Sequence, residues 1–206
     1  MCRFLFAIFM CVFYVTSSHA QKRPYFDTTI HLFTDTNYVA RFVIDNEDGQ
    51  YDDDDRKNAA FMLFKGKRLM YHDSLSVTGP DGGDLVQSID YSGDGIRDLV
   101  LFHLSDVRSN HQFYLYIVDT ASHSVHRVRG FEEIKSASGA PSYDSVNNII
   151  GSYVMSGTDY MKFYKIKPNF TAVDCGYTVY DDHIHDKRVD RQLQKIYKKE
   201  GWKLQP

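Results

Sequence analysis

Cysteine is scarce in this 206-residue sequence, which contains only Cys2, Cys11 and Cys175. Cys2 and Cys11 lie in an N-terminal segment that we expect to be removed, so the remaining chain has one thiol and no internal disulfide. Its fold must therefore be held by an apolar core, with or without a metal ion. Cys175 lies in a strand-like run, where a buried thiol is usually inert.

Long apolar runs are also lacking. The longest, residues 4–15, carries no charge but falls short of the roughly 20 residues needed to span a bilayer. Arg3 precedes this run, and Ser18-His19-Ala20 follows it with small residues on either side of His19, which is typical of a secretory signal peptide. The sequence therefore predicts a cleaved signal peptide over residues 1–20. Residues 21–206 are predicted to form a single domain in the periplasm, without a membrane anchor.

An excess of basic residues is absent as well. The sequence has 24 Lys and Arg against 27 Asp and Glu, a formal net charge of -3. No basic stripe is present, which argues against nucleic acid as a partner. Acidic residues gather between Asp45 and Arg56, where we predict a solvated loop, with a site for a metal or a cationic partner as the alternative.

Familiar catalytic motifs are missing from the sequence. It has no G-x-S-x-G nucleophile turn, no H-E-x-x-H pair and no phosphate-binding glycine loop. His183 and His185 would share one face of a strand and suit zinc, but the sequence offers no third ligand. We therefore predict a binding protein and not an enzyme, with a metal-dependent enzyme using these two histidines as an alternative.

The sequence is rich in short runs of aromatic and β-branched residues, including 15 Tyr and 14 Phe. Turn residues separate these runs, and no helix-length amphipathic segment lies between them. This pattern predicts an all-β fold, as an antiparallel sandwich or barrel or a small propeller-like domain. Residues 112–119 are apolar on both faces, so we expect that strand to be central. The predicted strands are residues 28–33, 38–44, 59–64, 68–72, 84–89, 99–104, 112–119, 123–128, 149–154, 160–167 and 171–180.

The C-terminal residues 188–206 allow two interpretations. Leu193, Ile196 and Tyr197 have helical spacing, whereas Glu200-Gly201 is typical of a hairpin turn. We predict the hairpin.

An Asp-rich loop between two predicted strands has the spacing of a calcium site. The predicted ligands are the side chains of Asp90, Ser92, Asp94 and Asp98 and the carbonyl of Ile96. Gly95 permits the sharp turn that lets both halves of such a loop face one ion. We predict a structural Ca²⁺ that holds two strands in register, with a plain Asp/Gly turn as the alternative.

Three blocks of the sequence resemble a known family. They are S-I-D-Y-S-G-D-G-I-R-D-L-V-L-F, F-Y-L-Y-I-V-D-T-A-S-H-S-V, and S-Y-D-S-V-N-N-I-I-G-S-Y-V-M-S-G-T-D-Y-M-K-F-Y-K-I-K. They are similar to bacterial periplasmic calcium-binding lysozyme inhibitors and immunity proteins, such as the Xanthomonas inhibitor of a type IV-secreted, lysozyme-like toxin. The resemblance covers residues 84–168. It implies an all-β immunity protein that occludes the active site of a lysozyme-like peptidoglycan hydrolase delivered by a bacterial secretion system.

The resemblance also singles out a short string of residues as the partner-binding loop. The string is similar to the S-G-x-x-Y loop that lysozyme inhibitors insert into the enzyme cleft, where hydroxyls can bond catalytic carboxyls and an aromatic ring can fill a sugar subsite. An ordinary hairpin turn is the alternative. A different function, a calcium-stabilised adhesion or carbohydrate-binding module, also stays open, although such modules usually repeat the acidic loop. The implied partner-binding residues are Ser156, Gly157, Thr158, Asp159 and Tyr160.

Overall fold

The computed structural model describes residues 24–45, 57–79, 84–137, 139–184 and 186–203. The predicted signal peptide, most of the acidic stretch between Asp45 and Arg56, and His185 lie outside these residues. Among the described residues, no helix is both long and apolar enough to cross a membrane.

Within the described residues the chain forms three four-stranded antiparallel sheets, each built from four consecutive strands. The first sheet consists of β1 (Phe26–Ile30), β2 (Tyr38–Ile44), β3 (Ala59–Lys65) and β4 (Arg68–Leu75). The second consists of β5 (Val86–Ile89), β6 (Asp98–Ser105), β7 (His111–Asp119) and β8 (Ser124–Val128), followed by the short 3₁₀ helix η1 (Phe131–Glu133). The third consists of β9 (Ser142–Asp144), β10 (Ile149–Val154), β11 (Asp159–Lys167) and β12 (Thr171–Asp181).

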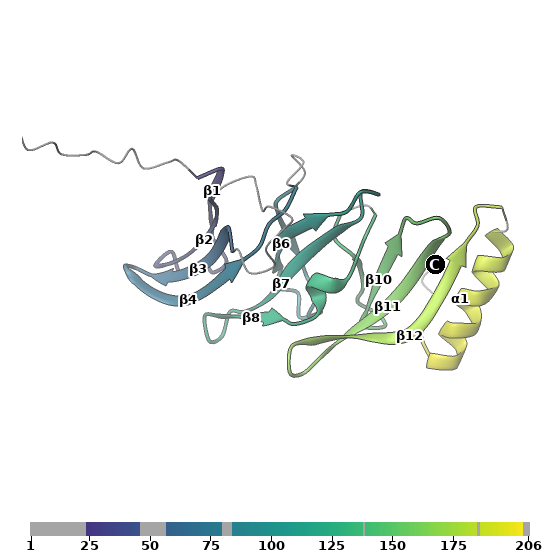
Figure 1. Ribbon diagram of the computed structural model, residues 1–206. Coiled ribbons are helices and arrows are strands. Elements are labelled where there is room, and N and C mark those ends of the chain that lie inside the picture. Colours follow the sequence, from purple (N-terminus) through teal and green to yellow (C-terminus); the bar gives the residue numbers. More distant parts are fainter. Residues whose placement is uncertain (1–23, 46–56, 80–83, 138, 185, 204–206) are drawn as a thin grey trace, which may run out of the picture.

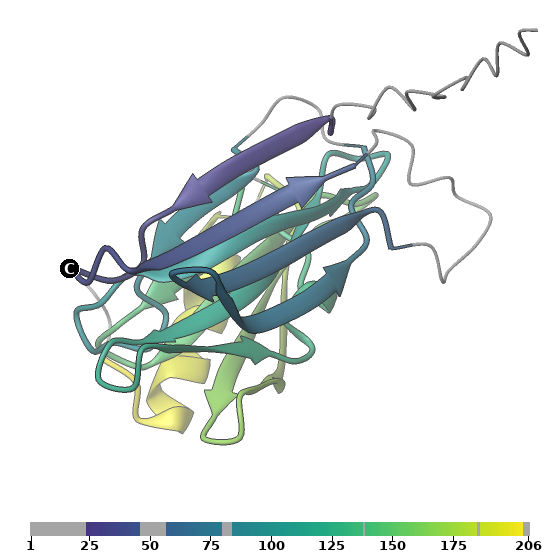
Figure 2. The same ribbon diagram turned by 90° about the vertical axis from the view of Figure 1, so that its left-hand side faces the viewer.

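The second sheet lies between the other two, because most of β6 and β7 is buried on both faces. On one side Phe61 of the first sheet packs against Tyr116, with 4.5 Å between ring centroids. On the other side Ile150 of the third sheet joins the same core. The sheets follow one another across Figure 1, and Figure 2 shows the first sheet lying over the second. The predicted all-β sandwich and its central strand are confirmed.

The C-terminal hairpin prediction is wrong, because residues 186–200 form the helix α1 (Asp186–Glu200). Gly201 adopts a φ of +68°, and the Trp202 N–H donates to the Tyr197 carbonyl at 2.8 Å. This is the glycine-ended closure common at helix C-termini, so the Glu200-Gly201 pair ends a helix and does not turn a hairpin. Burial decides between the two patterns. The apolar face of α1 covers the outer face of the third sheet in a second core that includes Ile149, Phe163, Val179, Val189 and Trp202.

Candidate functional site

The predicted partner-binding string forms the tip and one side of the β10–β11 hairpin. Its first three residues lie in the turn, where Gly157 and Thr158 are exposed. Its last two residues begin β11, where Tyr160 pairs with Val154 across the ladder. The structure therefore places Tyr160 in a strand beside the tip and leaves only the turn protruding.

Asn110, at the end of the β6–β7 connection, holds one side of this hairpin. Its side chain is buried, donating from Nδ2 to the Met155 carbonyl at 2.9 Å and accepting from the Met155 N–H at 2.8 Å. Asp106 fixes Asn110 in turn, because its Oδ1 accepts the Asn110 N–H at 3.0 Å. Burial raises the pKa of Asp106, but the Lys135 ammonium at 3.0 Å and several N–H donors outweigh it and hold that pKa well below its usual range. The turn end of the hairpin is thus anchored to the second sheet.

Asp159 holds the other side of the hairpin. Its Oδ1 accepts the Ser156 N–H at 2.8 Å, and its Oδ2 accepts the Tyr153 hydroxyl at 3.2 Å and lies 2.8 Å from His183 Nε2. The Ser156 N–H and then the His183 bond lower the pKa of Asp159. The Asp159 bond and then the charge of Asp181 raise the pKa of His183. The turn is therefore tied to the segment between β12 and α1 as well.

Among the hydroxyl groups of the string, one has a hydrogen-bond partner within the turn and two have none in the part of the chain that the structure describes. The Ser156 hydroxyl donates to the Thr158 carbonyl, so it shapes the turn. Among the described residues, the hydroxyls of Thr158 and Tyr160 have no hydrogen-bond partner. The Tyr160 ring stands at 63° to that of Tyr180, with 6.3 Å between centroids, and Tyr180 is half exposed. This end of the third sheet thus offers two unpaired hydroxyls beside an accessible aromatic pair.

Sequence reasoning singled out the string as a candidate, but it gave no sign of the residues that brace it. Asn110 lies in the turn-like sequence S-D-V-R-S-N, which gives no sign that its amide reaches residue 155. His183 was considered only as a zinc ligand, whereas in the structure it bonds Asp159. Contacts between connections so far apart in the sequence follow from the stacking of the sheets, which local patterns do not encode.

The Asp-rich loop joins β5 to β6, where the sequence placed it. Asp98, the first residue of β6, holds the loop closed through hydrogen bonds. Asp98 is fully buried. Its Oδ2 accepts the N–H groups of Tyr91 at 2.8 Å and Ser92 at 3.0 Å, and its Oδ1 accepts that of Val118 at 2.9 Å. Burial outweighs these three bonds and raises the pKa of Asp98 to about 6. The side chain ties the loop to β7.

Asp90 and Asp94 also accept backbone N–H groups, from residues 93–96 of the loop. Asp90 accepts the N–H groups of Gly93 at 2.6 Å and Gly95 at 2.9 Å, and both glycines have positive φ. Asp94 accepts the N–H of Ile96 at 2.7 Å. Each carboxylate is thus occupied by the backbone of its own loop.

The predicted calcium ligands are engaged in hydrogen bonds within this arrangement. Among the described residues, no group of three or more His, Cys, Asp and Glu side chains is placed to hold a metal. Ser92 directs its hydroxyl to Asp90 at 3.3 Å, as in a plain hydrogen-bonded turn. An ionised carboxylate has about four acceptor sites, so these bonds leave oxygen lone pairs unused. The calcium site stays a prediction from sequence.

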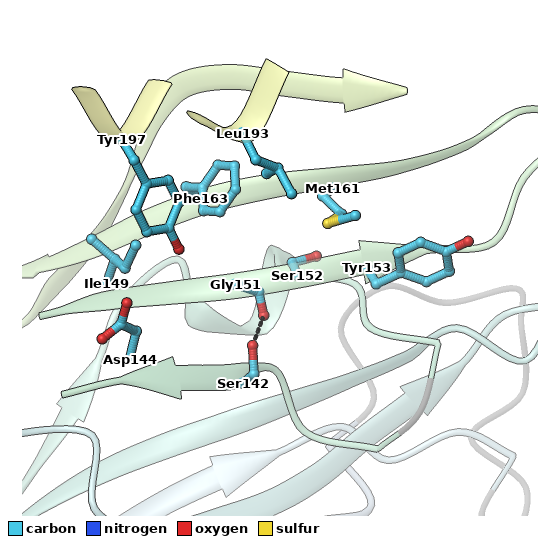
Figure 3. Close-up of a pocket in the computed structure, with 10 residues that line it drawn as sticks. All are labelled: Ser142, Asp144, Ile149, Gly151, Ser152, Tyr153, Met161, Phe163, Leu193 and Tyr197. Atoms are coloured by element: carbon cyan, nitrogen blue, oxygen red, sulfur yellow. Dashed lines mark hydrogen bonds between the residues drawn. The ribbon is translucent and has the colours of Figure 1, made fainter. Parts of the chain in front are cut away.

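A pocket of about 240 Å³ lies between α1 and the third sheet. Figure 3 shows Leu193 and Tyr197 of α1 above Phe163 and Met161 of β11. Its one carboxylate, Asp144, accepts backbone and side-chain N–H groups from Asn147 in its own turn. None of the predicted site residues lines this pocket.

Comparison with known proteins gives one structural likeness. No protein-family model and no curated protein matches the sequence. A solved structure described as "Structure of a Xanthomonas Type IV Secretion System related protein" is similar over 78% of this chain and 84% of that chain, with 15% sequence identity and a TM-score of 0.49. A likeness at this level assigns neither a function nor a partner.

Proposed function

We propose that this chain is a periplasmic immunity protein that occludes the active site of a lysozyme-like peptidoglycan hydrolase, a toxin delivered by a bacterial secretion system. The observation that carries the proposal is the braced β10–β11 hairpin. Its exposed tip is held on one side by Asn110 and on the other by Asp159 and His183. The family resemblance of residues 84–168 supports the same conclusion.

Bracing matters because a rigid loop loses little entropy when it binds. Lysozyme-type enzymes hold a pair of carboxyl groups in an open groove that receives a glycan chain. The unpaired hydroxyls of Thr158 and Tyr160 could donate to those carboxyls, and the Tyr160 ring would occupy the place of a sugar. Ser156 would act indirectly, because its hydroxyl already bonds the Thr158 carbonyl and sets the shape of the turn.

Inhibition of wall lysis tests the proposal. The mature protein is mixed with c-type, g-type and i-type lysozymes and with lytic transglycosylases, and the clearing of a peptidoglycan suspension is followed. We expect near-stoichiometric inhibition of at least one of these enzymes. Failure to bind or inhibit any of them would contradict the proposed class of partner.

Substitutions of Tyr160 test whether the β10–β11 turn and the Tyr160 ring plug the enzyme groove. Tyr160→Ala should weaken inhibition by about 10-fold or more, since aromatic anchors commonly contribute above 1.4 kcal/mol to such interfaces. Tyr160→Phe keeps the ring and should lose only the part due to the hydroxyl. Tyr177→Ala is the control, because Tyr177 lies on the same sheet but packs toward α1. Full inhibition by Tyr160→Ala would contradict the proposal that the Tyr160 ring fills the enzyme groove.

A second candidate function is binding of carbohydrate by an adhesion-type module. The half-exposed Tyr180 ring beside Tyr160 favours it, since exposed aromatic rings can stack on sugars. Binding of soluble peptidoglycan fragments by the mature protein alone, lost in Tyr180→Ala, would support this function over inhibition.

A further inference from the structure

Three chain connections meet at one end of the second and third sheets. They are the β6–β7 connection (residues 106–110), the β10–β11 turn (residues 155–158) and the segment between β12 and α1 (residues 182–184), at the top of Figure 1. Direct bonds fix their order. Asn110 joins the first to the second through Met155, and His183 joins the third to the second through Asp159. The β10–β11 turn is therefore the middle one of three adjoining connections.

The β6–β7 connection is a tight turn organised around Asp106. The Asp106 carboxylate accepts the N–H groups of Arg108 at 2.9 Å and Asn110 at 3.0 Å, and the Asp106 carbonyl accepts that of Ser109 at 2.9 Å. This closure pushes Val107 to the tip, where its side chain is 100% exposed.

The segment between β12 and α1 is held in a similar way. The His183 N–H donates to Asp181 Oδ1 at 2.9 Å, and the Ile184 N–H donates to Asp182 Oδ1 at 3.2 Å. Arg188 of α1 lies 3.3 Å from Asp182. The result is a hydrogen-bonded segment on which Ile184 is 77% exposed.

Val107 and Ile184 are the two most exposed large apolar side chains among the described residues. Exposed apolar side chains are common when scattered singly over a surface. Here Val107 and Ile184 both stand on hydrogen-bonded connections. These two connections flank the β10–β11 turn, which the Asn110 and Asp159 bonds brace. Apolar side chains at the rim of a protruding loop are suited to contact the two walls of a cleft that the loop enters.

We propose that the partner-binding surface is a composite of all three connections, with Val107 and Ile184 as flanking anchors on either side of the β10–β11 turn. The partner that this surface fits is a protein with an active-site groove between two partly apolar rims. This inference rests on the proposed function and names where the hydrolase makes its outer contacts. The middle turn enters the groove, and the two flanking side chains lose their exposure against the rims.

The experiment measures binding of the mature protein to the lysozyme or transglycosylase that it inhibits in the assay above. Val107→Asp and Ile184→Asp place a charge at each flank, and we expect each to raise Kd by about 10-fold or more, the loss of an interface anchor worth about 1.4 kcal/mol. Val146→Asp is the matched control, because Val146 is 57% exposed in the β9–β10 turn at the opposite end of β10. We expect the control to bind like the wild type and the thermal midpoints of all three to match it, because the replaced side chains are exposed.

The outcomes separate the two proposals. Suppose that the wild type binds, that Tyr160→Ala weakens binding, and that both flank variants bind like the wild type. The composite surface is then overturned, while the insertion of the β10–β11 turn and Tyr160 into the groove stands. Equal weakening by Val146→Asp would also overturn it, since the effect would then come from charge alone. If the wild type binds none of the enzymes, the proposed function and this inference fail together.

Discussion

Asn110 and Asp98 show how single buried polar side chains fix the two loops of interest. Asn110 satisfies both the N–H and the carbonyl of Met155, and Asp98 accepts three backbone N–H groups from two separate segments. An unpaired buried backbone group costs about 1–3 kcal/mol, so either side chain is hard to replace. Each loop is thus tied by a buried polar side chain to a second segment of the chain.

The pairing of His183 with Asp159 makes the bracing of the β10–β11 turn dependent on pH. The pKa of His183 is raised above its ordinary 6.5, so its contribution to stability is complete below pH 6.5 and is lost as the pH rises through the folded value. The pKa of Asp159 is lowered from 3.8, so its contribution is complete above pH 3.8 and is lost as the pH falls through the lowered value. The turn is braced best between these two limits.

An NMR titration of the His183 ring checks this dependence. We expect the pKa of His183 to lie above 6.5 in the wild type and to fall in Asp159→Asn, which removes the first cause of the shift. Asp174→Asn is the control, since Asp174 pairs with Lys162 on the same sheet. An unchanged His183 titration in Asp159→Asn would show that the two side chains do not interact in solution.

Calcium can be tested at the Asp-rich loop through thermal stability. The sequence prediction expects saturating Ca²⁺, but not Mg²⁺, to stabilise the domain by RT ln(1 + [L]/Kd), about 2.7 kcal/mol at 100 times Kd. Asp94→Asn should abolish this gain, because it removes a charge yet keeps an oxygen for the Ile96 N–H. A midpoint unchanged by calcium in the wild type would contradict the prediction and agree with a loop closed by hydrogen bonds alone.

Among the secondary-structure elements, α1 packs on the third sheet together with the aromatic residue that follows it. Trp202 follows the helix and packs its ring against Phe163 at 5.7 Å and Tyr197 at 5.4 Å between centroids. It is the only tryptophan in the sequence, so its fluorescence reports on this contact alone.

Removing this side chain should loosen the helix from the third sheet. We expect Trp202→Ala to lower the free energy of unfolding by about 3–5 kcal/mol, in line with other buried aromatic truncations. Chemical denaturation followed by circular dichroism measures the loss, and Trp202→Phe should retain most of the stability. A loss below about 1 kcal/mol in Trp202→Ala would mean that α1 contributes little to the fold.

The elements differ in how far their sequence revealed them. Strands such as Tyr38–Ile44 and Ile149–Val154 carry β-branched and aromatic side chains that fit a buried sheet, and their predicted bounds match the structure. Strand β9 is only three residues long and partly exposed, so no pattern marks it. The helix was missed because Leu193 and Tyr197 have the spacing of both alternatives, and only contact with the third sheet decides between them.

In the candidate site, too, the sequence reveals the local motif but not the distant residues that hold it. The string at Ser156–Tyr160 is visible in the sequence, but its supports are distant. Asn110 lies 45 residues before Met155, which it bonds, and His183 lies 24 residues after Asp159. For the calcium ligands the sequence placed the loop between its strands correctly. It could not show that Asp98 turns to the backbone of Val118 on a neighbouring strand.

Across the complete domain, the main apolar core contains residues from all three sheets. We therefore expect the sheets to unfold together, because separating any one of them exposes the same core. Trp202 fluorescence reports on the α1 end and far-ultraviolet circular dichroism on all the sheets, so the two denaturation curves should coincide. An earlier transition by fluorescence would show that α1 and the third sheet form a separate unit.

Every sheet ladder joins strands that are neighbours in the sequence. Short loops close at low entropic cost, so each sheet can pair its strands without waiting for a distant part of the chain. A polypeptide that emerges end-first from a ribosome or a translocation channel can complete the first sheet, add the second against it, and finish with the third. The β10–β11 turn, which we propose enters the partner, then belongs to the last sheet to be assembled, upon a scaffold that already exists.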